Sequence, residues 1–257
     1  MPFADNEGLK IHYETIGNGP PLIMVPGLAA SNIVWKLNGY QDELKDSFTL
    51  IPTEPRGFGK SSKPYHPESY DYKHIAADIV SVLDDLGLEK AHYLGYSMGA
   101  EMGYGLIKYA QNRFHSFILG GGNPSNKALN TSRSTWKTGF QNGVEYFVTG
   151  AEPVFGDYWS SDLAAMFRAN DAKALVAYNS VELDEKFSEI FPSISVPCLI
   201  YGGDKDDWMD GVEEMVVSIP EHRYVVVEGG LDHFGGYFSA KALKPYLLQF
   251  MKDYDFL

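Results

Sequence analysis

A serine between two glycines is the feature of this sequence with the clearest chemistry. Residues 95–99 read G-Y-S-M-G, and Ser97 follows the predicted strand 91–96 and precedes a glycine-rich segment with helical spacing. A nucleophile at a tight strand-to-helix turn needs small neighbours, because the backbone is strained there and larger side chains collide. The start of a helix also favours developing negative charge. The pattern predicts that Ser97 is a nucleophile.

A serine hydroxyl is barely ionised at neutral pH, so it needs a base. His233 lies in the glycine-rich loop 228–236, just after the last predicted strand. Active sites of α/β sheets collect at the carboxyl ends of strands, so His233 is the predicted base. The remaining histidines fall in predicted strands, helix starts or polar loops and are interpreted as surface or packing residues: His12, His66, His74, His92, His115 and His222.

An acid should hold the imidazole in the required tautomer. Candidates cluster after the predicted strand that ends at Gly202: Asp204, Asp206, Asp207 and Asp210. All of them fit the chain order serine, acid, histidine that accompanies a G-x-S-x-G turn. Their spacing alone does not choose among them. Asp232, beside the histidine, is interpreted as structural or solvated.

Backbone N–H groups are needed to hold the oxyanion that forms when a serine attacks a carbonyl. One predicted donor is Met98, directly after the nucleophile. The other is Leu28, in the loop 25–29 after an early predicted strand. Pro26 in the same loop has no N–H to donate.

Short β-branched or aromatic runs alternate along the chain with segments of helical periodicity. This alternation predicts an α/β fold, with a mostly parallel sheet flanked by helices. Between 123 and 192 the strand pattern disappears and aromatic residues accumulate, which predicts a small inserted helical cap. The core then comprises residues 1–122 and 193–257. The glycines at 120–122 could suggest a phosphate-binding loop, but no motif supports one. They are interpreted as close packing at the point where the cap begins.

The composition narrows the possible partners. The 257 residues carry a formal net charge of −13, whereas nucleic-acid binding needs clustered Lys and Arg, so no nucleic-acid partner is expected. No leader pattern is found and no apolar stretch approaches the ~20 residues of a membrane span, so we expect a cytoplasmic protein without a membrane partner. The expected partner is a small-molecule substrate, and the oligomeric state stays open.

Neither a metal nor an organic cofactor is expected, because the sequence has no phosphate-loop or zinc-protease motif. The single cysteine, Cys198, lies in the apolar run 196–201 and is interpreted as a buried core thiol.

These motifs together resemble the α/β-hydrolase superfamily, in its small-capped branch of epoxide-hydrolase-like and esterase-like proteins. Residues 95–99 match the family's nucleophile elbow, and 55–61 match its D-x-R-G-x-G-x-S loop. The stretch 203–206 is similar to the family's G-x-x-D, whose last residue is the triad acid, so the resemblance implies Asp206. His233 matches the family's late histidine.

The sequence departs from the family pattern at two places. Pro26-Gly27 stands where the family has His-Gly, a histidine that organises the oxyanion loop. Without this histidine the loop can adopt a different geometry, but the backbone N–H donor of the loop can still be present. Thr53-Glu54-Pro55 stands where the family prefers an Asp.

The resemblance implies a serine hydrolase that cleaves a small, mostly apolar ester, lactone or related carbonyl substrate. A serine nucleophile distinguishes this chain from similar dehalogenases and epoxide hydrolases, which use Asp, and implies an acyl-enzyme. Four residues are expected to line the substrate pocket: Gly27, Tyr96, Trp159 and Phe234. Two alternatives remain, a cofactor-free lyase or peroxidase-like enzyme on the same triad, and a ligand receptor or regulatory protein with slow turnover.

Overall fold

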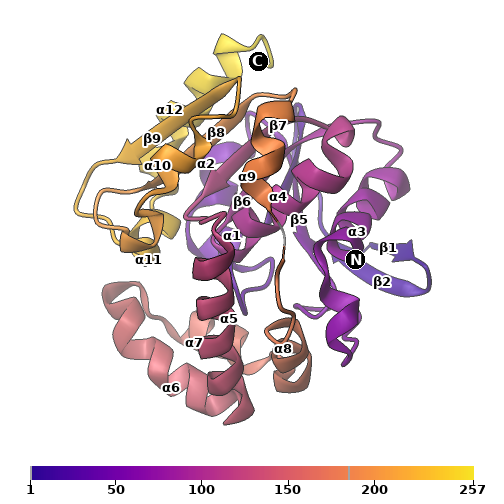
Figure 1. Ribbon diagram of the computed structural model, residues 1–257, viewed down its shortest axis with the longest axis vertical. Coiled ribbons are helices and arrows are strands. Elements are labelled where there is room, and N and C mark those ends of the chain that lie inside the picture. Colours follow the sequence, from indigo (N-terminus) through magenta and orange to yellow (C-terminus); the bar gives the residue numbers. More distant parts are fainter. Residues whose placement is uncertain (1, 185) are drawn as a thin grey trace.

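The computed structural model describes residues 2–184 and 186–257, which form one sheet covered by helices on both faces (Figure 1). The strand order is β1-β2-β5-β4-β6-β7-β8-β9, with β3 paired to β5 beside that path. The pairs from β5 through β4 to β9 are parallel, and those of β1, β2 and β3 are antiparallel. The predicted mostly parallel α/β sheet is thereby confirmed. The strands are β1 (Phe3–Asn6), β2 (Leu9–Tyr13), β3 (Ile16–Gly17), β4 (Pro21–Val25), β5 (Thr49–Glu54), β6 (Ala91–Tyr96), β7 (Phe114–Gly120), β8 (Cys198–Gly203) and β9 (His222–Val227).

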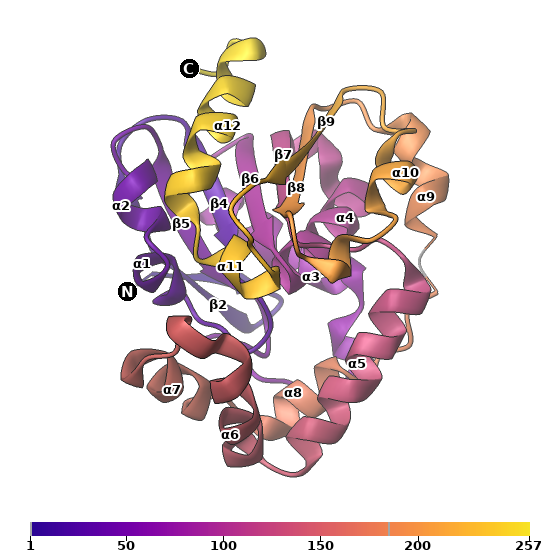
Figure 2. The same cartoon turned by 90° about the vertical axis from the view of Figure 1, so that its left-hand side faces the viewer.

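Helices α3 (Tyr72–Asp85) and α4 (Met98–Ala110) lie on one face of the sheet, and α1 (Val34–Leu37), α2 (Tyr40–Leu44) and α12 (Ala240–Asp253) lie on the other (Figure 2). Helix α3 buries the apolar stripe that its sequence predicts, and the Asp71 side chain caps its first turn by accepting from the His74 N–H. Two shorter helices, α10 (Val212–Val216) and α11 (His233–Tyr237), follow β8 and β9.

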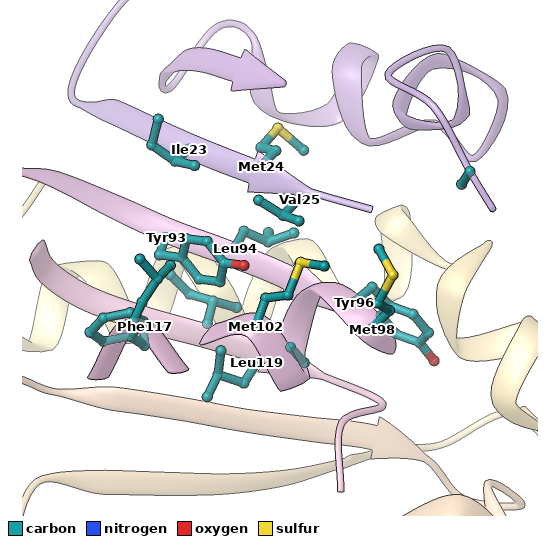
Figure 3. Close-up of a cluster of buried hydrophobic side chains, with 14 of the residues drawn as sticks. Ile23, Met24, Val25, Tyr93, Leu94, Tyr96, Met98, Met102, Phe117 and Leu119 are labelled. Atoms are coloured by element: carbon teal, nitrogen blue, oxygen red, sulfur yellow. The ribbon is translucent and has the colours of Figure 1, made fainter. Parts of the chain in front are cut away.

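The core beside the nucleophile is a layer of apolar side chains between the central strands and α4 (Figure 3). A Cβ added at Gly103 would overlap the Leu119 side chain and come within 2.9 Å of the Tyr93 ring. The glycines of α4 therefore let the helix lie closer to β6 and β7 than larger residues allow.

Helices α5 to α8 lie together beyond the carboxyl ends of the parallel strands (Figure 1). They occupy the chain between β7 and β8: α5 (Asn126–Gln141), α6 (Val144–Phe155), α7 (Ser161–Arg168) and α8 (Ala172–Tyr178). Helix α9 (Phe187–Ile190) returns to the core, where the Phe187 ring packs 5.3 Å from Tyr72 and 5.9 Å from Tyr104. No described helix is both long and apolar enough to cross a lipid bilayer.

Candidate active site

Ser97 lies at a strained turn where β6 ends and α4 begins. Its backbone has φ 53° and ψ −118°, a conformation that a residue with a side chain rarely adopts. A Cβ at Gly95 would overlap the Gly99 carbonyl, and a Cβ at Gly99 would overlap the Val25 carbonyl. The two glycines of the motif are therefore required by close backbone contacts on both sides of Ser97.

Three side chains form a continuous hydrogen-bonded relay. Ser97 Oγ lies 3.0 Å from His233 Nε2, and His233 Nδ1 lies 3.0 and 3.2 Å from the two carboxylate oxygens of Asp206. The Asp206 side chain is fully buried and also accepts a hydrogen bond from the Trp208 N–H. An imidazole that donates from Nδ1 to a carboxylate presents Nε2 as an acceptor to the serine. This arrangement can remove a proton from Ser97.

The other acids of this region have different contacts. Asp204 accepts from the Gly230 and Leu231 N–H groups at 3.0 and 2.6 Å, and these bonds lower the pKa of its carboxyl. Asp232 accepts from the Gly235 N–H at 2.7 Å and caps helix α11. Both therefore shape the loop that carries the histidine. Asp207 and Asp210 are exposed.

The loop after β4 is held against the nucleophile by a tyrosine. The Gly27 N–H donates to Tyr237 Oη at 3.1 Å, and a Cβ at Gly27 would stand 3.5 Å from Ser97 Cβ. From the cap, Asn170 Nδ2 donates to the Ala29 carbonyl at 2.7 Å. Leu28 lies on the cavity wall between these two contacts, and Met98 is the first residue of α4. Their N–H groups stay the predicted oxyanion donors.

Glu54 stands where the family pattern has an Asp, and its buried carboxyl group has partners in three other segments. Its carboxylate accepts from the Asn32 N–H at 2.9 Å and the Lys60 N–H at 2.7 Å, and it lies 2.8 Å from His12 Nδ1. Because Asn32 follows the loop of Leu28, the buried Glu54 ties that loop to β2 and to the turn after β5. The sequence offered no account of this residue.

A cavity of about 730 Å³ lies between the Ser97 turn and helices α5, α6 and α7. Its walls are largely apolar and aromatic and come from the loop after β4, from α5, α6 and α7, and from α11. Ser97 and His233 also line this cavity. The fully buried Cys198 lies elsewhere, and burial raises the pKa of its thiol to about 12, so it is unreactive. No group of three or more His, Cys, Asp or Glu side chains placed to hold a metal ion occurs among the described residues.

The family model for the alpha/beta hydrolase fold matches residues 20–197. The chain belongs to this family. A non-heme haloperoxidase of Rhodococcus erythropolis is 24% identical to this α/β hydrolase over 98% of the chain and 100% of the relative. An epoxide hydrolase of Siraitia grosvenorii, epoxide hydrolase 3, is 28% identical, but its match covers 44% of the chain and only 36% of the relative.

Solved structures share the fold over nearly the whole length. The enol-lactonase from Burkholderia xenovorans LB400 superposes with a TM-score of 0.79 at 21% identity, covering 98% of this α/β hydrolase and all of that chain. An esterase from Thermogutta terrifontis gives a TM-score of 0.78 at 19% identity, covering 98% and 97% of the two chains. At sequence identities of 19% and 21%, the similarity to these two structures shows a shared fold and nothing more.

Two of the four residues expected in the pocket of this α/β hydrolase do not line it. Gly27 and Phe234 are on the cavity wall. Tyr96 is fully buried behind it, and Trp159 lies outside the wall against Phe155 and Phe167, with ring centroids 5.9 and 6.0 Å away. The expectation for Tyr96 and Trp159 is corrected, because both side chains support the residues that form the wall.

Sequence reasoning missed two residues of the site. Tyr237 follows His233 by four positions, but nothing in the sequence indicates that its hydroxyl reaches Gly27, which is 210 residues away. Glu101 lies on the cavity wall one helical turn after Ser97. The spacing of four residues along a predicted helix is the signal that could have found it.

Proposed function

We propose that this α/β hydrolase is a serine hydrolase that cleaves a small, mostly apolar ester, lactone or related carbonyl compound through an acyl-enzyme. The observation that carries the proposal is the relay from Asp206 through His233 to Ser97, which opens into an aromatic cavity. A relay of this kind activates serine for attack on a carbonyl carbon.

In the first half of the reaction, Ser97 Oγ bonds to the carbonyl carbon while His233 Nε2 takes the serine proton. The N–H groups of Leu28 and Met98 hold the resulting oxyanion. His233 then gives the proton to the leaving oxygen, the bond between carbon and leaving oxygen breaks, and an acyl-Ser97 ester remains.

In the second half, His233 removes a proton from water and the hydroxide attacks the acyl carbon. Collapse of the second oxyanion releases the carboxylic acid and returns the proton to Ser97. No redox change occurs, and every proton passes through the same imidazole nitrogen.

Labelling with a fluorophosphonate, followed by intact-mass measurement, tests the proposal. We expect rapid addition of one label to the wild type and none to Ser97→Ala, with labelling of His233→Ala slower by at least 1,000-fold. The surface variant Ser218→Ala is the matched control and should label like the wild type. An unlabelled wild type would favour the receptor alternative, and undiminished labelling of Ser97→Ala would contradict the assigned nucleophile.

A second candidate is favoured by the full-length similarity to the haloperoxidase. On the same acyl-enzyme, hydrogen peroxide in place of water would give a peracid without any cofactor. Competition between water and peroxide for one acyl group, measured as acid and peracid formed, distinguishes the two. Acid as the dominant product at millimolar peroxide supports hydrolysis.

A further inference from the structure

Glu101 presents a carboxyl group to the cavity beside the nucleophile. It lies on α4 four residues after Ser97, and its N–H donates to the Ser97 carbonyl. The residue is only 8% exposed, yet it belongs to the cavity wall. Within the described part of the chain, no hydrogen bond or ion pair reaches its carboxyl.

Arg133, whose charge acts on Glu101, makes its hydrogen bonds to Tyr178. The buried Arg133 guanidinium donates to the Tyr178 carbonyl at 2.9 Å and to Tyr178 Oη at 3.1 Å, and it stacks 4.3 Å from the centre of that ring. Burial raises the pKa of Glu101 to about 7 and outweighs the effect of the Arg133 charge, which favours the ionised form of Glu101. The carboxyl is buried among protein atoms except where it meets the cavity, so a further hydrogen-bond partner would reach it from the cavity beside the nucleophile.

The position of Glu101 fits the acyl side of a substrate. Residues four apart on a helix share one face and differ by about 6 Å along its axis. Because His233 must protonate the leaving oxygen, the leaving group lies toward α11. The acyl group then extends toward α4 and α5, the helices that carry Glu101 and Arg133. Both helices lie to the right of α11 in Figure 2.

We propose that Glu101 forms a polar subsite that binds a hydrogen-bond donor, a hydroxyl or an amide N–H, on the acyl group of the substrate. The subsite makes the enzyme select acyl chains that are apolar except for one polar substituent about two or three bonds from the scissile carbonyl. This inference rests on the proposed serine hydrolase function and adds the substrate class to it. A buried polar group discriminates strongly against ligands that leave it unpaired.

A pair of esters of equal shape tests the subsite. 4-Nitrophenyl 3-hydroxybutanoate and 4-nitrophenyl 3-methylbutanoate differ by a hydroxyl in place of a methyl group. For the wild type we expect kcat/KM to be at least about tenfold higher for the hydroxy ester. Glu101→Leu should reverse this preference, and Glu101→Gln, which still forms hydrogen bonds, should keep most of it.

Matched measurements separate the subsite from a general role in folding or positioning. The exposed Glu152→Gln should leave the ratio of the two kcat/KM values unchanged, and fluorophosphonate labelling of Ser97 reports whether each variant is folded. A wild type without preference overturns the inference. So does an equal loss on both esters in Glu101→Leu, which would indicate a positioning role.

Binding to the inactive Ser97→Ala variant keeps the inference apart from the proposed function. The shift in melting temperature is measured with the methyl esters of the same two acids. A larger shift with the hydroxy ester that disappears in Ser97→Ala/Glu101→Leu supports the subsite even if the wild type hydrolyses neither ester, an outcome that overturns only the proposed function. Equal shifts overturn the subsite.

Discussion

The ring of Tyr237 lies flat on the ring of Tyr96, with centroids 4.5 Å apart and planes at 4°. Each hydroxyl of this pair contacts a different part of the site. Tyr237 Oη accepts from the Gly27 N–H, and Tyr96 Oη donates to the His233 carbonyl at 2.8 Å. The stacked pair therefore joins the loop after β4, which carries Gly27, to helix α11, which begins at His233.

Removing the Tyr237 hydroxyl should loosen the oxyanion loop while preserving the stack. In Tyr237→Phe the buried Gly27 N–H loses its acceptor, which costs about 1–3 kcal/mol of stability. We expect kcat to fall roughly 10- to 100-fold, less than the 100- to 1,000-fold typical of losing an oxyanion donor outright, with little change in KM. Steady-state kinetics and a melting curve measure the two effects. Tyr246→Phe, which removes an exposed hydroxyl, is the control. An unchanged kcat in Tyr237→Phe would show that the loop keeps its conformation without the Tyr237 hydroxyl.

Asp204 and Asp206 should respond differently to replacement by Asn. Asp206→Asn should lower kcat by about 10⁴-fold, because the amide favours the wrong imidazole tautomer. Asp204→Asn should lower kcat much less, since Asp204 accepts hydrogen bonds from the backbone of the loop before His233. Single-turnover rates with one activated ester compare the variants directly. A larger loss in Asp204→Asn would mean that the acid is misassigned.

Glu101 should make the hydrolase less stable as the pH rises. Its pKa is raised from an ordinary 4.5 to about 7, so between these values the folded state holds a proton that the unfolded state has released. The free energy of unfolding therefore falls by about 3 kcal/mol as the pH rises from 4.5 to 7, for a pKa shift of this size. Above pH 7 the contribution of Glu101 is constant. Urea unfolding at pH 5 and pH 8 measures it. The difference between wild type and Glu101→Gln isolates this group, and a difference independent of pH would contradict the raised pKa.

The Glu54 carboxylate should be essential for the stability of the loops around it. In Glu54→Gln one carboxylate oxygen becomes an NH₂ group that faces N–H donors, so one of the bonds from Asn32 and Lys60 is lost and the other is no longer charge-assisted. We expect a loss of about 2–4 kcal/mol in the free energy of unfolding. Glu89→Gln, an exposed change, should stay within about 0.5 kcal/mol of the wild type in the same denaturant titration. Equal stability of both variants would show that solvent replaces the Glu54 contacts.

Some features of this protein follow from the sequence alone, because they depend on interactions between near neighbours in the chain. The glycines around Ser97 predict the strained turn, since only small residues fit its close backbone contacts. Alternating strand and helix patterns predict the parallel sheet, and the order of the chain places His233 after a late strand. These inferences need only patterns that can be read along the chain, although the contact that requires Gly99 is made by the distant Val25 carbonyl.

Other features depend on which distant segments the tertiary structure brings together. Asp204 and Asp206 lie at similar distances along the chain from β8 and from His233. Packing buries the Asp206 carboxylate beside His233, whereas the Asp204 carboxylate accepts from backbone N–H groups. Tyr96 was expected on the pocket wall, but its ring stacks on Tyr237 behind the wall. The Tyr237 hydroxyl binds the N–H of Gly27, which is 210 residues away in the sequence. Likewise the tertiary structure places Arg133 against Tyr178, and among the described residues none forms a hydrogen bond or ion pair with the Glu101 carboxyl. The burial and hydrogen bonding of each side chain depend on neighbours supplied by other strands and helices, and no local pattern specifies those neighbours.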